Sequence, residues 1–155
     1  MMTNTMTTTA QLYAETQRLV SPAAMLFNAA LSAGQRRRFW AGLLRRPTAL
    51  RTLAMAGRAM GGHSAGRRQV RLADIRGTEG RAGDFDSEFF PLTGQTRRRW
   101  ESVAEAMEAG LVLPPVQLIE VGGEYYVRDG HHRVSVARAL EQDTIETEVT
   151  VWSAN

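Results

Sequence analysis

The stretch that decides the fold runs from residue 122 to residue 140 and reads Gly122-Gly123-Glu124-Tyr125-Tyr126-Val127-Arg128-Asp129-Gly130-His131-His132-Arg133-Val134-Ser135-Val136-Ala137-Arg138-Ala139-Leu140. Residues 125–127 are aromatic and β-branched, which is typical of a strand. Val136, Ala137 and Leu140 fall on one face of a helix. The stretch therefore predicts a strand that turns at Gly130 directly into a helix.

The corner between this strand and this helix favours an anion. The first N–H groups of a helix have no partner within the helix, and its dipole places about half a positive charge there. Gly130 allows a sharp turn and a close approach to a ligand, and Arg133 adds a guanidinium fork suited to phosphate. We call residues 129–133 the elbow and interpret it as a phosphate-binding site. The alternative is an ordinary turn followed by a solvated Arg133.

The sequence around the elbow resembles a known superfamily. Residues 113–152, with Leu113-Pro114-Pro115-Val116 before one strand and Asp129-Gly130-His131-His132-Arg133 after the next, look like the ParB/sulfiredoxin superfamily. ParB proteins carry Gly-Glu-Arg-Arg at this place, sulfiredoxins carry Gly-Cys-His-Arg, and free-serine kinases carry Asp-Gly-His-X-Arg, which is nearest to this chain. The resemblance covers about residues 70–152 and is specific for fold rather than for activity.

What the resemblance implies is a nucleotide whose phosphates are held at the elbow. The ligand would be ATP or CTP with Mg²⁺, bound by Asp129, Gly130, His131, His132 and Arg133. Upstream, residues 70–75 followed by Glu79-Gly80-Arg81 resemble the first strand and loop of the superfamily. In its kinase members a loop Glu is the general base, so Glu79 is the implied catalytic residue, and Arg81 would reach the phosphates or order the loop. The alternative is a local salt bridge between Glu79 and Arg81 without catalysis.

Residue types that are missing from the chain exclude several chemistries. There is no cysteine, so disulfides and thiolate zinc sites are excluded. Sulfiredoxin activity is excluded as well, since the catalytic Cys of that family corresponds to His131. All 19 basic residues are arginines, which excludes lysine chemistry. Because His131 and His132 diverge by about 100° on a helix, we expect no histidine metal site.

The chain is electrically divided into a basic and an acidic half. Residues 1–76 hold twelve arginines against Glu15 and Asp74, a net charge of +10, whereas residues 77–155 hold seven arginines against fourteen acids, a net charge of −7. The N-terminus lacks the features of a signal peptide, and the longest uncharged stretch, residues 19–35, is short and broken by polar residues and Pro22. We therefore expect a cytoplasmic protein without a transmembrane segment.

The basic half predicts an appendage to the fold. We expect a disordered segment over residues 1–10, an Arg-rich helical extension with a linker over residues 11–66, and the ParB/sulfiredoxin-like domain over residues 67–155. Within the extension we expect helices over 22–33, 35–45 and 48–60, with Gly34 as a stop, and then a glycine-rich linker over 61–66.

The run Arg36-Arg37-Arg38-Phe39-Trp40 in this extension allows three interpretations. It could contact nucleic acid or anionic lipid through arginine and tryptophan. It could lie on the acidic half of the same chain or of a second copy in a homodimer. It could also be a solvated face.

The remaining elements predict an α+β domain, an α/β arrangement with a small mixed sheet. We expect a strand over residues 70–75, a long loop over 76–91 in which Asp84 and Asp86 are exposed, and a helix over 96–109 with Trp100 in the core. A hairpin over 113–128 turns at Gly122 and Gly123, and a helix over 132–140 and a strand over 145–152 follow.

The sequence thus predicts a nucleotide-binding protein in a regulatory or nucleic-acid-associated role. One alternative is a small-molecule kinase or nucleotide hydrolase that uses Glu79 as general base. Another is a protein or DNA interaction module without nucleotide.

Overall fold

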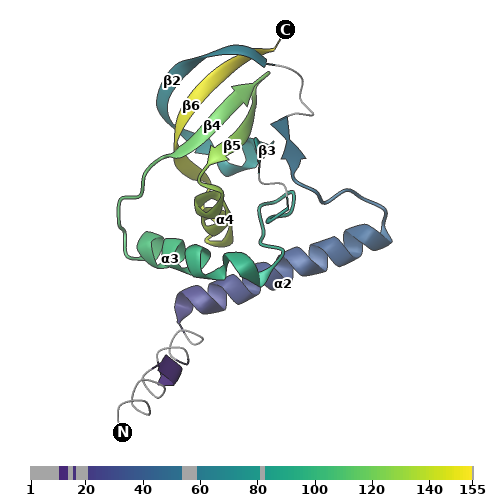
Figure 1. Ribbon diagram of the computed structural model, residues 1–155, viewed down its shortest axis with the longest axis vertical. Coiled ribbons are helices and arrows are strands. Elements are labelled where there is room, and N and C mark those ends of the chain that lie inside the picture. Colours follow the sequence, from purple (N-terminus) through teal and green to yellow (C-terminus); the bar gives the residue numbers. More distant parts are fainter. Residues whose placement is uncertain (1–10, 14–15, 17–20, 54–58, 81–82, 155) are drawn as a thin grey trace, which may run out of the picture.

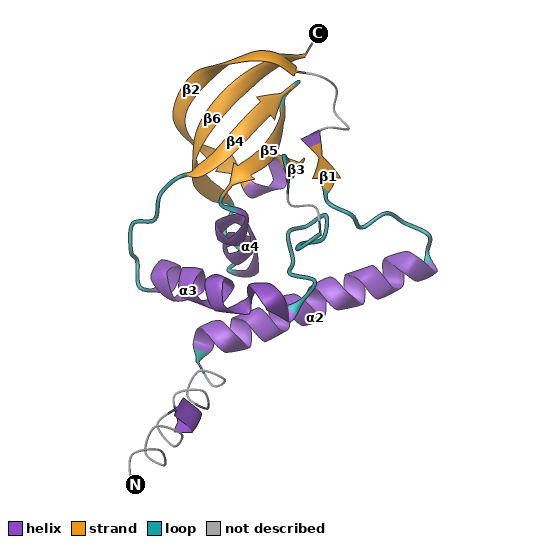
Figure 2. Cartoon of the chain, viewed as in Figure 1, coloured by secondary structure: helices purple, strands orange, loops and turns teal. Residues whose placement is uncertain are grey.

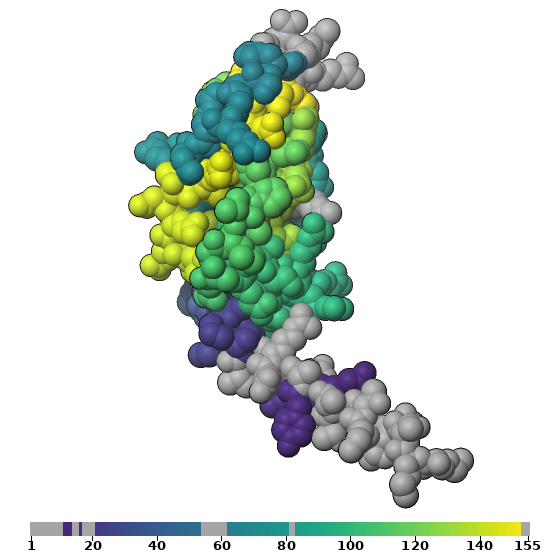
Figure 3. All heavy atoms as spheres, turned by 90° about the vertical axis from the view of Figure 1, so that its left-hand side faces the viewer, coloured from purple at the N-terminus to yellow at the C-terminus, as the bar shows by residue number. Residues whose placement is uncertain are grey.

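The computed structural model describes residues 11–13, 16, 21–53, 59–80 and 83–154, and these form stacked layers. The strands form one layer, the helix α4 (His131–Ala139) lies against it, α3 (Arg97–Glu108) lies beyond α4, and the long helix α2 (Pro22–Leu43) is outermost (Figures 1 and 2). Figure 3 shows the same order from the side, with the sheet at the end away from α2. Each helix contacts the next, because α4 packs on α3 and α3 packs on α2.

The six strands form one mixed sheet. Their order is β1-β3-β5-β4-β6-β2, with parallel pairs β1/β3, β3/β5 and β4/β6 and antiparallel pairs β4/β5 and β2/β6. The sheet and its helices confirm the predicted α+β class. The strands are β1 (Arg51–Thr52), β2 (Ala59–Arg71), β3 (Ile75–Thr78), β4 (Val116–Val121), β5 (Glu124–Asp129) and β6 (Thr144–Ala154).

The predicted hairpin is confirmed between β4 and β5. Gly122 and Gly123 have φ values of 59° and 83°, so both central residues of the turn are left-handed, which glycine tolerates at little cost. The register pairs Val121 with Glu124 across the turn. Because β5 then ends at the elbow, this tight turn fixes where α4 begins.

Trp100 is buried at the centre of the three helices, as the apolar stripe of its helix predicts. Its ring meets Phe27 of α2 edge-on at a centroid distance of 5.3 Å, and its Nε1–H donates to Ser135 Oγ of α4 over 2.8 Å. The guanidinium of Arg97 lies over the same Phe27 ring, 4.5 Å from its centroid. The Trp100 indole thus contacts both α2 and α4 from α3, and its single N–H group is hydrogen-bonded.

The prediction of two helices over residues 22–45 is wrong, because α2 continues through Gly34. A Cβ at this position would lie 2.7 Å from the carbonyl oxygen of Pro91 and 3.1 Å from Cβ of Phe90. The glycine therefore serves the close packing of α2 against a loop and does not end the helix.

The predicted helix over residues 48–60 and the linker over 61–66 are also wrong. Residues 51 and 52 form β1, residues 54–58 lie outside the described part of the chain, and residues 59–71 form β2, which runs antiparallel to β6. At Gly62 a Cβ would lie 2.5 Å from the Trp152 ring, so the missing side chain makes room for an indole. The strand expected at 70–75 is split by a 3₁₀ turn (Leu72–Asp74) into the end of β2 and the start of β3.

The expected exposure of Asp86 in the long loop is wrong as well. Its side chain is fully buried and accepts hydrogen bonds from the backbone N–H groups of Glu88 and Phe90, both over 2.9 Å. The Nε–H of Arg37 on α2 donates to its other oxygen over 3.1 Å. Asp86 therefore shapes the loop and ties it to α2. The disorder expected for residues 1–10 lies outside the described residues.

Candidate phosphate-binding site

The backbone of the elbow has the predicted form of a strand that turns through glycine into a helix. Gly130 has φ 100° and ψ 24°, and the first hydrogen bond of α4 runs from the Val134 N–H to the Gly130 carbonyl over 3.0 Å. A Cβ on Gly130 would lie 3.0 Å from both Val116 Cγ2 and Arg133 Nη2. Both the dihedral angle and the space select glycine here.

Three arginines from three different elements surround the start of α4. Arg99 of α3, Arg128 of β5 and Arg133 of α4 line a cavity of about 170 Å³, together with the rest of the elbow. Converging guanidinium groups at the positive end of a helix form an environment suited to an anion. Arg128 and Arg133 each pair with a carboxylate, Glu79 and Asp129, so Arg99 is the positive charge that the fold adds to the elbow.

Arg99 is the site residue that motif reasoning missed. Its signal in the sequence was weak: Arg97, Arg98 and Arg99 open a helix, where the dipole disfavours cations. In the structure they separate, because Arg97 pairs with Glu101 and Asn28 whereas Arg99 lies at the cavity. Among the described residues, no carboxylate pairs with Arg99.

Arg133 is held by its own surroundings and is not a solvated residue. Its Nη1 donates to the carbonyl oxygens of Pro114 and Pro115, the latter over 2.9 Å, and its Nη2 donates to Asp129 Oδ2 over 2.8 Å. The side chain is only 13% exposed. Arg133 thus fastens the segment before β4 to the start of α4, and Asp129 pairs with it and makes no side-chain cap on the helix.

Glu79 lies beside the site and contacts it through a salt bridge with Arg128. The Nε and Nη2 groups of Arg128 donate to the two carboxylate oxygens of Glu79 over 3.0 and 3.4 Å. The Glu79 N–H donates to the Val127 carbonyl over 2.9 Å, which places Glu79 at the end of β3 next to β5. The structure therefore gives Glu79 a partner in Arg128. Arg81, the partner that the sequence suggested, lies outside the described residues.

The two histidines pack beneath the elbow. Both are buried; His131 stacks on the Phe85 ring at a centroid distance of 6.4 Å, and His132 meets the same ring edge-on at 5.5 Å. His131 Nε2 lies 2.6 Å from Thr78 Oγ1, which also accepts from the Gly80 N–H over 3.1 Å. In the described part of the chain, no group of three or more metal-ligating side chains comes together.

The comparisons with known proteins give one similarity. No family model matches this chain, and no curated protein matches its sequence. Among solved structures, the chain is similar to sulfiredoxin from Arabidopsis thaliana, with 21% sequence identity and a TM-score of 0.44 over 56% of this chain and 86% of that chain. What the site can bind is therefore indicated by the contacts described above and not by this similarity.

Proposed function

We propose that this protein binds a nucleoside di- or triphosphate at the elbow through its phosphate groups, together with Mg²⁺, in a regulatory or nucleic-acid-associated role. The observation that supports this proposal is the convergence of Arg99, Arg128 and Arg133 on one cavity at the start of α4. Charge-assisted hydrogen bonds from guanidinium to phosphate are among the strong ones in proteins.

The size of the cavity suits the phosphates rather than the whole nucleotide. About 170 Å³ is below the roughly 300–1,000 Å³ of a site that encloses a small molecule. The base would lie outside this cavity, so the arginines do not distinguish ATP from CTP. Mg²⁺ is usually held by one or two carboxylates and by the phosphates themselves, and Asp129 and Glu79 are the carboxylates that border the arginines.

A binding role agrees better with the surroundings of Glu79 than catalysis does. Both oxygens of its carboxylate accept from Arg128, so the pair would have to open before Glu79 could take a proton from a substrate. A phosphotransferase or nucleotide hydrolase is the second candidate, because this pair lies at the edge of the arginine cavity. Turnover that Glu79→Gln abolishes while nucleotide binding is retained would support the enzyme, whereas a binding protein would show no turnover in either form.

The test is calorimetric titration with ATP, CTP, GTP and ADP in the presence of Mg²⁺. Arg99→Ala is the decisive variant, because Arg99 faces the cavity without holding the fold together as Arg133 does. Arg98→Ala is the matched control, since Arg98 is exposed on the same turn of α3 and does not line the cavity. We expect Arg99→Ala to weaken binding about tenfold or more, from about 1.5–3 kcal/mol for a hydrogen bond to a charged group, and Arg98→Ala to leave it unchanged.

Two results would contradict the proposal. One is the absence of binding to any of the four nucleotides at millimolar concentration. The other is an equal effect of Arg98→Ala and Arg99→Ala, which would show that only overall charge matters. Either result would favour an interaction module whose elbow has a structural role.

A further inference from the structure

The outer side of α2 carries large apolar side chains that nothing in the described chain covers. The inner side packs on the domain through residues that are almost fully buried: Ala23, Ala24, Phe27, Ala30 and Gly34. The exposed side chains are Met25 (64%), Phe39 (69%), Trp40 (57%) and Leu43 (66%), followed by Leu44 (62%) just after the helix. Four of these five side chains, from Phe39 to Leu44, cluster at the C-terminal end of the helix, and an exposed apolar cluster of this kind marks an interaction site.

The geometry of α2 separates these two sides cleanly. At about 100° per residue, Met25, Phe39, Trp40 and Leu43 fall within an arc of about 100° that lies opposite the buried residues. The helix is the outermost layer of the molecule, and its C-terminal half runs past the end of α3 (Figure 1). This apolar arc therefore lies on a convex face of the molecule that a flat surface could reach.

The charge around this face is uniformly positive. The sequence has no Asp or Glu between Glu15 and Asp74. Within residues 36–46 there are five arginines, of which Arg37 turns toward Asp86 and Glu88 of the domain, at 3.1 and 3.7 Å, while the other four are exposed. Only one of the five is therefore neutralised by the domain itself.

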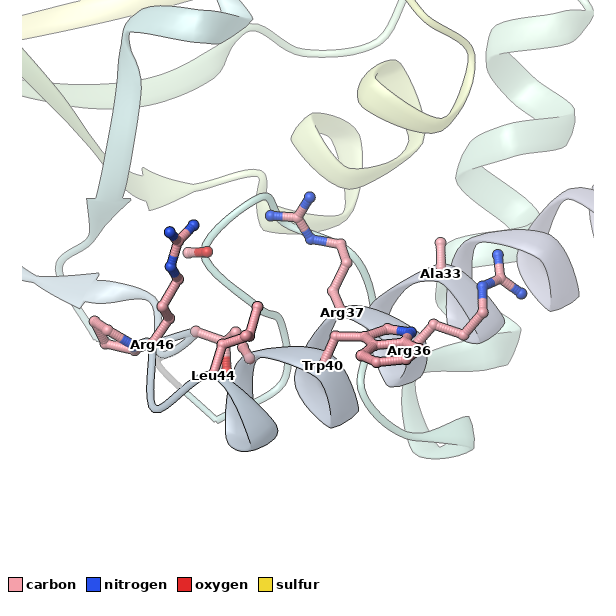
Figure 4. Close-up of a pocket in the computed structure, with 10 residues that line it drawn as sticks. Ala33, Arg36, Arg37, Trp40, Leu44 and Arg46 are labelled. Carbon is pink, nitrogen blue, oxygen red and sulfur yellow. The ribbon is translucent and has the colours of Figure 1, made fainter.

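A cavity of about 450 Å³ adjoins the face on the side toward the long loop. Figure 4 shows Arg36 beside Trp40 and the Arg46 guanidinium across the cavity, with Leu44 between them. Cationic and apolar side chains thus alternate over the C-terminal half of α2. We call Arg36, Phe39, Trp40, Leu43 and Leu44 the α2 surface.

We propose that the α2 surface binds the surface of an anionic lipid bilayer. An interfacial helix inserts Trp, Phe and Leu about 5–10 Å into the boundary between headgroups and acyl chains, and basic side chains beside them contact anionic headgroups. The long arginine side chains can extend toward phosphates while their aliphatic stems stay in contact with apolar groups. The α2 surface has both components on one convex side of the protein.

The composition of the surface favours lipid over nucleic acid. Nucleic acids use arginine and stacked aromatic rings, and Phe39 and Trp40 could serve in that way. Leu43 and Leu44 gain nothing from stacking on bases, whereas they gain free energy on transfer into hydrocarbon. Association of two copies through this face would bring like charges together around Arg36. Charge and apolarity together therefore suit an anionic surface with hydrocarbon beneath it.

The experiment is flotation of the full chain with vesicles that contain phosphatidylglycerol and, separately, with vesicles of phosphatidylcholine alone. We expect binding only to the anionic vesicles, and weaker binding at high salt because the attraction is screened. Leu43→Asp should lower partitioning about tenfold or more, in line with the roughly 1.5–3 kcal/mol for burying one leucine. Val112→Asp is the matched control, since Val112 is 96% exposed in the loop between α3 and β4 and does not line the cavity beside α2.

Tryptophan fluorescence gives a second measurement, which reports whether Trp40 enters the bilayer. Insertion of Trp40 should shift the emission of the anionic-vesicle complex to the blue, whereas the buried Trp100 should contribute no shift. Trp40→Phe should keep the binding and remove the shift. Arg99→Ala should leave vesicle binding unchanged, which separates this proposal from nucleotide binding at the elbow.

Several results would overturn the proposal. These are no binding to anionic vesicles, equal binding to both kinds of vesicle, or equal losses for Leu43→Asp and Val112→Asp. Salt-sensitive binding of a single-stranded oligonucleotide without vesicle binding would assign the α2 surface to nucleic acid. A dimer that Leu43→Asp dissociates, again without vesicle binding, would assign it to a second copy of the chain.

Discussion

Replacement of Gly130 by alanine tests whether the elbow needs glycine for both of its geometric reasons. The first reason is the dihedral angle, since φ is 100° and an L-residue in this left-handed region costs about 1–2 kcal/mol. The second is space, because the new Cβ would lie 3.0 Å from Val116 Cγ2 and from Arg133 Nη2. Val116 is buried and Arg133 is held by two carbonyls and Asp129, so neither neighbour moves away freely.

The two contributions can be separated with matched glycines. Gly123 has φ 83° with no atom within 4 Å of its added Cβ, so Gly123→Ala measures the dihedral cost alone. Gly94 has the same open space without a positive φ and gives the baseline. With about 1–3 kcal/mol for overpacking added to the dihedral cost, Gly130→Ala should lose about 2–5 kcal/mol of unfolding free energy and Gly123→Ala about 1–2 kcal/mol.

The assay is urea unfolding followed by far-ultraviolet circular dichroism, with free energies compared at equal m-values. If Gly130→Ala loses no more stability than Gly123→Ala, the packing around the elbow is looser than the structure indicates. The argument that glycine is required there by space would then fail, and only the dihedral argument would remain.

Two further predictions concern charged groups away from the elbow. Asp86→Asn should lower the unfolding free energy by about 2–4 kcal/mol, because the new NH₂ group would face either the Arg37 Nε–H or two backbone N–H groups, all of them donors. Asp84 is less buried, so Asp84→Asn should change the unfolding free energy little. Burial, followed by the hydrogen bond to Glu124, raises the pKa of Tyr126 above its usual value. Because the pKa of Tyr126 is higher in the folded than in the unfolded chain, this tyrosine contributes its full stabilisation at pH values below its pKa in the unfolded chain. The stabilisation is lost as the pH rises through its pKa in the folded protein. Ultraviolet titration should therefore show one tyrosine that ionises late, and Tyr126→Phe should remove that step; a late step that persists in the variant would contradict the assignment.

The parts of the fold that the sequence predicted are those fixed by neighbours along the chain. The turn at Gly122 and Gly123, the strand before Gly130 and the helix after it each depend on dihedral preferences within a few residues. The stripe that buries Trp100 repeats along one helix. Local signals of this kind survive folding because tertiary packing reinforces them.

The parts that the sequence could not predict are decided by partners far along the chain. Residues 61–66 look like a linker because they contain three glycines, yet β6 lies alongside them, and Trp152 fills the space at Gly62. Gly34 looks like a helix stop because its packing against Pro91, 57 residues away in sequence, is invisible locally. In both places glycine signals a close approach rather than flexibility, and only the tertiary structure distinguishes the two.

The arginines show the same limit most clearly, because the sequence gives their positions and not their partners. Arg37 pairs with the buried Asp86, whereas the arginines on either side of it point elsewhere around the helix and stay exposed. In the run at the start of α3, Arg97 binds across to α2 while Arg99, two residues later, reaches the cavity at the elbow. A helix turns by about 100° per residue, so three adjacent identical side chains face three different surroundings. A basic run therefore predicts charge but assigns no function to its members, and here one arginine of each run ties helices and loops together while others stay exposed or line a cavity.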